Sequence, residues 1–295
     1  MKNDKNILPF KRLPSWLRRN IISLEGTKDV RRILKTYALH TVCDSAACPN
    51  RGECFGNKTA TFLILGNVCT RKCRFCNITK GSPLSVDNEE PQKIASAVND
   101  LNLKHVVVTS VTRDDLPDKG AEHFARTIKA IKNMNPEITI EVLTPDFMGD
   151  TDCLKIVLAE KPDIFNHNIE TVPRLYQEIR VGADYERSLH LLKMSKELSP
   201  DIITKSGLIL GLGEEKKEVI EVLYDLKQAG CEIITIGQYM QPSLKHYPVQ
   251  RYLLPEEFDE LKKEGEKIGF KYVFSAPLVR SSYLADVVIT NLLPK

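Results

Sequence analysis

The strongest constraint on the fold is an alternation that begins at Thr61, in which short apolar runs are followed by longer amphipathic segments. The apolar runs occupy residues 61–65, 105–110, 138–144, 163–169, 204–210 and 232–239, with a weaker run at 272–276. The segments with helical periodicity occupy residues 91–103, 121–134, 185–198, 216–230 and 255–269. Repetition of strand and helix builds a parallel sheet from right-handed βαβ units. We therefore expect an α/β fold, a partial (β/α)6 TIM-like barrel, with a doubly wound open sheet as the alternative.

The ends of these runs indicate where ligands bind, because both architectures place ligands beyond the carboxyl ends of their parallel strands. Cys69 follows the first run, and the later runs close on Thr109, Ser110, Asn168, Gly211 and Gln238. We expect these residues to surround one mouth. The repeat also predicts three regions: an N-terminal extension (1–60), the barrel (61–276) and a C-terminal tail (277–295). We expect both extensions to close over the barrel mouth.

Composition excludes several other classes of protein. The net charge is only +3, which gives no reason to expect nucleic acid or an anionic membrane as a partner. No apolar run approaches the ~20 residues that a membrane-spanning helix needs. The N-terminus lacks the apolar block of a secretory signal. We therefore expect a cytoplasmic protein whose thiols stay reduced and bind metal.

Two sets of three cysteines stand close together in the sequence. Cys69, Cys73 and Cys76 have the spacing C-x3-C-x2-C, directly after the first strand. Thiolates are soft ligands suited to iron–sulfur clusters or zinc, and three of them can hold three irons of a four-iron cluster while the fourth iron stays open. The alternative is a zinc knuckle completed by a ligand from elsewhere in the chain.

The other set, Cys43, Cys48 and Cys54, has the spacing C-x4-C-x5-C, which is not a usual zinc spacing. Its turn-rich loop can wrap around a second cluster, with a structural zinc as the alternative. The two remaining cysteines, Cys153 and Cys231, fall in apolar patterns and are expected to be inert buried thiols.

These stretches resemble a known family. VCTRKCRFCNI resembles the signature of radical S-adenosylmethionine (SAM) enzymes. The two cysteine spacings in this order resemble the lipoyl synthase family, as do VTSVTRDDLPDKGA, NHNIETVPRLY, SGLILGLGE, IGQYMQPS and VRSSY. The resemblance runs from about Trp16 to about Asp286.

The resemblance implies a sulfurtransferase with two [4Fe-4S] clusters and SAM. Such enzymes insert sulfur at C6 and C8 of a protein-bound octanoyl-lysine, and two SAM molecules are cleaved. SAM binds the cluster of Cys69, Cys73 and Cys76. The second, auxiliary cluster is the sacrificial sulfur donor. In the family its fourth ligand is a serine that matches Ser282, although a helix cap is the alternative role for Ser281 and Ser282.

The resemblance also implies partners and SAM contacts. The partners are an octanoylated lipoyl carrier domain or a glycine-cleavage H-type protein, an electron donor such as flavodoxin or ferredoxin, and a cluster-repair carrier protein. The SAM contacts expected from the strand-end motifs are Thr109, Ser110, Asn168, Glu170 and Arg180.

Several residues at these strand ends have alternative roles. Asp114 and Asp115 could assist SAM binding or belong to a solvated loop, and His167 could be only a hydrogen-bonded mouth residue. Gly211 and Gly213 could let the backbone approach SAM or form a strand-exit turn.

Basic residues cluster near the start of the chain: Lys11, Arg12, Arg18, Arg19, Arg31 and Arg32. They could steer an acidic carrier or form a solvated face. The competing functions are another two-cluster radical enzyme that attaches sulfur to RNA or peptide, a zinc-stabilised nucleic-acid-binding module and an electron-transfer protein.

Overall fold

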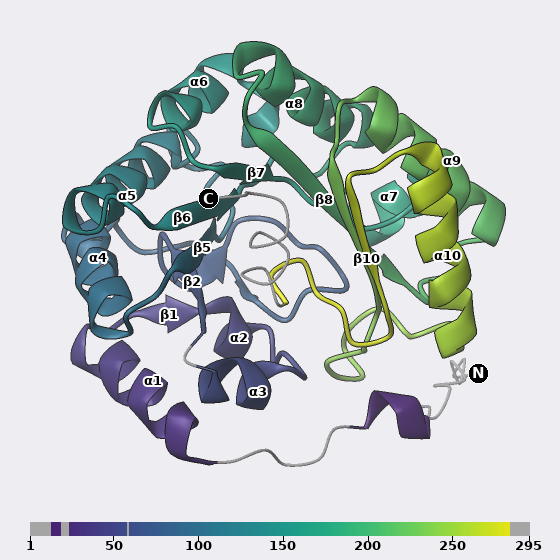
Figure 1. The fold of residues 1–295 in the computed structure, drawn as a ribbon, viewed down its shortest axis with the longest axis horizontal. Helices are drawn as coiled ribbons and strands as arrows, with labels where there is room; N and C mark the ends of the chain where they lie inside the picture. The colour runs from purple at the N-terminus through teal and green to yellow at the C-terminus, as the bar shows by residue number, and fades with distance from the viewer. Residues whose placement is uncertain (1–12, 19–23, 58, 284–295) are drawn as a thin grey trace, which may run out of the picture.

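The computed structural model describes residues 13–18, 24–57 and 59–283, and its centre is a curved sheet of eight strands (Figure 1). In spatial order the strands are β1 (His40–Thr41), β2 (Thr61–Ile64), β5 (His105–Ser110), β6 (Thr139–Leu143), β7 (Ile164–Asn166), β8 (Ile203–Leu210), β9 (Ile233–Gln238) and β10 (Tyr272–Ser275). From β2 to β10 every neighbouring pair is parallel, whereas β1 is antiparallel to β2. A separate short pair, β3 (Val68–Cys69) and β4 (Thr79–Lys80), follows β2.

Helices form a ring outside the sheet, as Figure 1 shows. They are α4 (Glu90–Asp100), α5 (Ala121–Met134), α6 (Thr151–Ala159), α8 (Tyr185–Leu198), α9 (Lys216–Gln228) and α10 (Pro255–Ile268), with the short α7 (Pro173–Ile179) before α8. The parallel strands lie in the order of the sequence, so the sheet has none of the reversal that defines a doubly wound fold. The expected partial barrel of six β/α units is confirmed, and β10 adds a seventh parallel strand.

Burial explains why these segments take these forms. All four residues of β2 and all six of β9 are buried, as expected for strands covered on both faces. Helix α5 buries Phe124, Ile128 and Ile131 completely on one face. Full burial of each such side chain contributes about 1.5–3 kcal/mol relative to exposure, so the repeat stabilises the barrel along its whole length.

The N-terminal extension contains η1 (Ser15–Leu17), α1 (Leu24–Thr36), α2 (Val42–Ser45) and α3 (Arg51–Gly56). At the open side of the barrel, its helices α1 to α3 lie beside β1 and β2, whereas its first helix, η1, lies near α10, where Trp16 Nε1 donates to the Leu253 carbonyl at 3.2 Å (Figure 1). The register of β1 pairs Thr41 with Phe62, which places α2 next to the start of β2. The sequence patterns did not predict β1, because a two-residue strand has no periodicity.

The C-terminal tail turns back from β10 into the centre of the ring of strands (Figure 1). The carbonyl of Val279 there lies against Gly237 of β9, and Ser281 reaches Asn168 beyond the end of β7. We expected the extensions to close over the mouth of the barrel. The described part of the tail enters the barrel from the mouth. Residues Lys11, Arg12 and Arg19, and the tail from 284 to 295, lie outside the described residues.

The fold also bears on the membrane question. Within the described ranges, no helix is both long and apolar enough to span a bilayer.

Candidate functional site

The C-x3-C-x2-C loop lies beyond the carboxyl end of β2 and is tied to its neighbours by backbone bonds. Thr70 donates from its backbone N–H (3.1 Å) and its hydroxyl (3.0 Å) to the carbonyl of Thr112. The Thr112 N–H in turn donates to the Cys69 Sγ at 3.4 Å, and Arg74 N donates to the Ile179 carbonyl at 2.8 Å. The loop is therefore fixed against the segments after β5 and α7.

The three thiols of this loop lie near one another. Burial raises the pKa of Cys76 to about 12, and the nearby thiols of Cys73 and Cys69 raise it further. Burial and the Cys69 thiol also raise the pKa of Cys73, although Arg180 opposes them. In the metal-free chain the thiols of Cys73 and Cys76 hold their protons, so a bound metal must displace them.

A buried ion-pair network ties the same loop to the segments that follow β5 and β6. Arg71, between the first two cysteines, is 7% exposed and binds the Asp114 carboxylate through Nε (2.7 Å) and Nη2 (2.9 Å). Its Nη2 also contacts Asp146 Oδ1 at 2.5 Å, and Asp146 accepts a second bond from Arg187 at 2.8 Å. The arginines hold the pKa of the buried Asp146 carboxyl well below its usual range despite burial.

This network answers one question left open by the sequence. Asp114 pairs with Arg71, and Asp115 pairs with Arg113 at 2.9 Å. Both carboxylates are therefore structural partners of arginines, in a folded loop after β5. The roles of Arg71 and Asp146 were missed, because no motif spacing links residues so far apart.

Three of the expected SAM contacts come together at the end of β7. Asn168 Nδ2 donates to Glu170 Oε1 at 3.0 Å, and Arg180 Nη1 donates to the Asn168 carbonyl at 2.9 Å. Burial raises the pKa of Glu170, although Arg180 lowers it. Arg180 also donates to the Tyr176 hydroxyl.

Some polar atoms at this mouth are buried and lack a hydrogen-bond partner within the described part of the chain. They include Ser110 Oγ, Asn168 Oδ1, His167 Nε2 and Arg180 Nε. Buried polar atoms are nearly always paired, so orphans gathered at strand ends indicate a missing polar ligand. The donors and acceptors suit the amino and carboxylate groups of an amino acid.

The other expected mouth residues have structural partners. The Thr109 hydroxyl donates to the Leu143 carbonyl at 2.8 Å. His167 Nδ1 lies 2.9 Å from the Thr144 carbonyl, and burial lowers the pKa of its imidazole to about 4, so the ring is neutral. Its Nδ1 is thus hydrogen-bonded, as the sequence allowed, while its Nε2 is one of the unpartnered atoms at the mouth.

Gly211 packs against the side-chain amide of Gln238 rather than opening towards a ligand. An added Cβ would lie 2.2 Å from Gln238 Nε2, and the Gly211 N–H donates to Glu214 Oε1 at 2.6 Å. The structure therefore favours the strand-exit turn.

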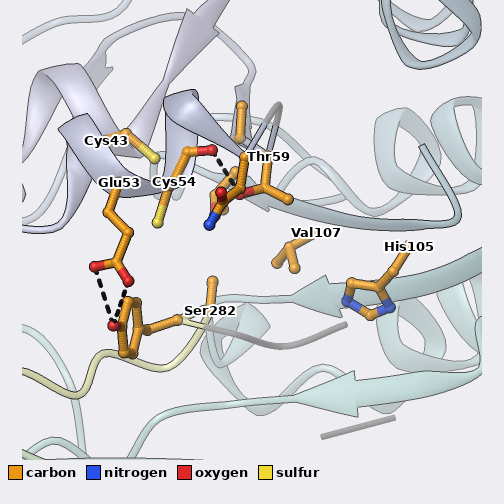
Figure 2. Close-up of a pocket in the computed structure, with 11 residues that line it drawn as sticks. Cys43, Glu53, Cys54, Thr59, His105, Val107 and Ser282 are labelled. Carbon is orange, nitrogen blue, oxygen red and sulfur yellow. Dashed lines mark hydrogen bonds between the residues drawn. The ribbon is translucent and has the colours of Figure 1, made fainter. Parts of the chain in front are cut away.

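Two cysteines of the second set, Cys43 and Cys54, line a different pocket, at the start of β2. Figure 2 shows Cys43 and Cys54 facing this pocket from α2 and α3, with Ser282 of the tail on its other side. Burial raises the pKa of Cys43 to about 11 and that of Cys54 to about 12. The pocket thus gathers two thiols and one hydroxyl that are distant in the sequence.

The two cysteine loops are also joined directly. Asn77, which follows Cys76, donates from Nδ2 to the Ser45 carbonyl at 3.0 Å. Half-buried Arg280 of the tail interacts electrostatically with both Cys48 and Glu170. The tail therefore lies near the auxiliary loop and near the residues at the end of β7.

The donor sets fit iron–sulfur clusters. In the described ranges, no three His, Cys, Asp or Glu side chains are gathered closely enough to hold one metal ion. Each set nonetheless places soft thiols within electrostatic range of one another. A cluster binds one thiolate per iron and so accepts thiols that stand apart.

Comparisons with known proteins agree with this geometry. The Radical SAM superfamily profile matches residues 63–226. Among solved structures, methylornithine synthase (PylB) aligns with a TM-score of 0.53 at 13% identity, over 84% of this chain and 81% of that one. Streptococcus suis SuiB bound to S-adenosylmethionine aligns with a TM-score of 0.55 at 12% identity, over 76% and 53%. These likenesses show the fold, and the profile shows the class: a radical SAM enzyme, with a [4Fe-4S] cluster and SAM as cofactors.

Curated relatives narrow the class. The lipoyl synthase of Caldanaerobacter subterraneus subsp. tengcongensis is 56% identical over 276 residues, covering 94% of this chain and 96% of the relative. That of Aquifex aeolicus is 56% identical over 257 residues, covering 87% and 93%. The chain belongs to the lipoyl synthase family and is a sulfurtransferase.

Proposed function

We propose that this enzyme inserts two sulfur atoms, at C6 and C8, into an octanoyl-lysine carried by a lipoyl carrier domain or a glycine-cleavage H-type protein. Two SAM molecules are consumed, and an auxiliary [4Fe-4S] cluster on Cys43, Cys48 and Cys54 supplies the sulfur. The observation that carries the proposal is the position of Ser282, which lines one pocket with Cys43 and Cys54. An electron-transfer protein normally holds its cluster with four cysteines and would not need a serine from the tail to complete the set.

On the SAM side, Cys69, Cys73 and Cys76 would hold the first cluster. A reduced cluster with SAM bound supplies the electron that breaks the sulfonium C–S bond, and thereby the radical that removes hydrogen from carbon. Glu170 and the Asn168 Oδ1 would accept hydrogen bonds from the SAM amino group, and Arg180 Nε would donate to its carboxylate. Ser110 would add a hydroxyl contact, and Thr109, whose hydroxyl already donates to Leu143, a packing contact.

On the auxiliary side, Ser282 would complete the ligand set. A serine oxygen is a harder partner for iron than thiolate is, so we assign it the role of a labile ligand that releases its iron when sulfur leaves. Cys43 and Cys54 are anchored in helices and would keep the rest of the set in place. In this proposal, region 1–60 supplies the auxiliary cysteines, region 61–276 supplies the SAM site, and region 277–295 supplies the serine ligand.

The remaining partners follow from the chemistry. An electron donor such as flavodoxin or ferredoxin and a cluster-repair carrier protein would act in the cytoplasm. The basic residues of the N-terminal extension, including Arg31 and Arg32, would steer an acidic carrier. Carrier affinity that falls with added salt is the expected result, and affinity independent of salt would remove this docking role.

The test of the function is anaerobic incubation of the reconstituted enzyme with an octanoylated peptide, SAM and a reductant. Mass spectrometry should find a product that has gained two sulfur atoms as a dithiol, and the corresponding disulfide, two hydrogens lighter, after the product is oxidised. A protein that contains only zinc, or a product without sulfur, would contradict the proposal. About eight irons per chain are expected before turnover, from two four-iron clusters.

A further inference from the structure

The tail between Pro277 and Tyr283 is held along its length by distant parts of the chain. Gln238 N, at the end of β9, donates to the Pro277 carbonyl at 3.1 Å. Asn50 Nδ2 donates to the Leu278 carbonyl at 2.7 Å. Within the tail, Tyr283 N donates to the Arg280 carbonyl at 3.0 Å.

Gly237 provides the closest contact with the tail. A Cβ at this position would lie 2.0 Å from the Val279 carbonyl oxygen and 2.9 Å from its carbon, so a side chain cannot fit without moving the tail. Glycine inside a strand weakens the strand and often marks a place where another backbone approaches closely. Gly237 lies inside the buried strand β9, and the approaching backbone is that of Val279.

Asn50 holds the tail from the opposite side. It lies between Cys48 and Cys54 in the sequence and is 1% exposed. Its side-chain amide spans from the auxiliary cysteine loop to the Leu278 carbonyl, and a buried donor of this kind is costly to leave unpaired. The sequence indicated only a turn residue here.

The residues on either side of Ser282 are also occupied. Ser281 Oγ accepts a bond from Asn168 Nδ2 at 3.2 Å, and the Tyr283 hydroxyl donates to the Glu53 carboxylate at 3.1 Å (Figure 2). The Ser282 hydroxyl, in contrast, has no hydrogen-bond partner in the described part of the chain, and it lines the pocket of Cys43 and Cys54. Ser281 and Tyr283 are thus fixed by hydrogen bonds, whereas the Ser282 side chain lies in the pocket with the two thiols.

From this arrangement we infer that Asn50 and Gly237 are positioning residues that hold the tail as a preformed arm, so that Ser282 faces the auxiliary thiols before any metal binds. The inference rests on the proposed role of Ser282 as the fourth ligand. Gly237 determines how deeply the tail enters the barrel, and Asn50 bonds the tail to the loop that carries Cys43, Cys48 and Cys54. A ligand held in its bound geometry loses less conformational freedom when it binds.

The first test uses metal-free protein and needs no activity. Hydrogen exchange of the tail amides between 278 and 283 is compared in the wild type, Gly237→Ala and Asn50→Ala. We call the two contacts that Gly237 and Asn50 make with the tail the clamp. We expect exchange at least about tenfold faster in both variants, because each loses one of these two contacts. Unchanged protection of the tail in both variants would overturn the inference.

Gly265→Ala is the matched control, because its added Cβ would lie 2.9 Å from Val273 Cγ2 and so crowds α10 against β10 without touching the tail. It should leave tail exchange at the wild-type rate. If Gly237→Ala fails to fold, Asn50→Ala still decides the question, since it removes a bond without adding bulk.

The second test loads only the auxiliary cluster, in a Cys69→Ala, Cys73→Ala, Cys76→Ala background. Mössbauer spectra of Gly237→Ala and Asn50→Ala should show the iron environment of Ser282→Ala instead of that of the background protein. If Ser282→Ala itself changes nothing, the proposed ligand role fails. If Ser282→Ala changes the spectrum and the two clamp variants do not, the positioning role fails.

Discussion

The two cysteine loops lie near each other but are built in different ways. The loop of Cys69, Cys73 and Cys76 follows β2, the first parallel strand of the barrel, and is held by Arg71 in a buried ion-pair network. The loop of Cys43, Cys48 and Cys54 is built on two short N-terminal helices. Ser282 lies beside it only because the C-terminal tail docks in the barrel.

From this difference we expect the two sites to form at different stages of folding. The first loop is complete once neighbouring β/α units have packed. The second requires both ends of the chain to dock on the barrel, and closing so long a loop costs entropy. Regions held by a few long-range contacts open with less free energy than a packed core does. The proposal of a permanent centre on the first loop and a consumed centre on the second agrees with this difference.

The largest expected effect comes from removing a ligand of the first loop. Cys73→Ala should abolish both SAM cleavage and sulfur insertion, because the bound cofactor carries the chemistry. Iron analysis should still find the auxiliary cluster, at about half of the wild-type iron. Undiminished turnover would contradict the assignment of this loop.

A change at Ser282 should affect only the second site. Ser282→Cys should bind the auxiliary cluster more tightly and lower sulfur insertion by about 100-fold, a size typical of changes around metal sites. SAM cleavage, measured as 5′-deoxyadenosine, should continue. A fully active Ser282→Cys enzyme would show that ligand lability is not required.

Breaking the network under the first loop should lower stability. Asp146→Asn leaves the buried Arg71 with Asp114 as its one remaining carboxylate, and leaving a buried polar group partly unsatisfied costs about 1–3 kcal/mol. Urea unfolding of the metal-free protein measures this loss. Glu178→Gln is the control, because Glu178 forms an exposed pair with Arg74 and its loss should leave the unfolding midpoint unchanged. An equal loss of unfolding free energy in both variants would show that the buried network stabilises the protein no more than an exposed ion pair does.

The smallest effect is expected at the end of the tail. Tyr283→Phe deletes the hydroxyl that donates to Glu53 but keeps the ring stacked on Phe274, at a centroid distance of 6.1 Å. The free energy of opening the tail should fall by about 0.5–1.5 kcal/mol, the usual net value of one hydrogen bond. Hydrogen exchange of the tail reports this value, and exchange of the Cys69 loop should not change.

Much of the barrel could be predicted from the sequence, because burial on both faces of a parallel sheet leaves apolar runs that are visible residue by residue. The weak run at 272–276 forms β10 as expected. The short strand β1 could not be predicted, since its two residues gain their form only by pairing with β2. At the mouth, the patterns indicated Asn168, Glu170 and Arg180, which the fold brings together, but not the partners that orient them.

The sequence by itself indicated the class of chemistry, since the type and spacing of Cys69, Cys73 and Cys76 favour iron–sulfur ligation and are local properties of the chain. Only the tertiary structure decided what surrounds those thiols. Asn50 reads as a turn residue and Gly237 as a weak point in a strand, until the tail is seen between them. Their roles depend on contacts between residues far apart in the chain, and such contacts exist only once the barrel has folded and the tail has entered it.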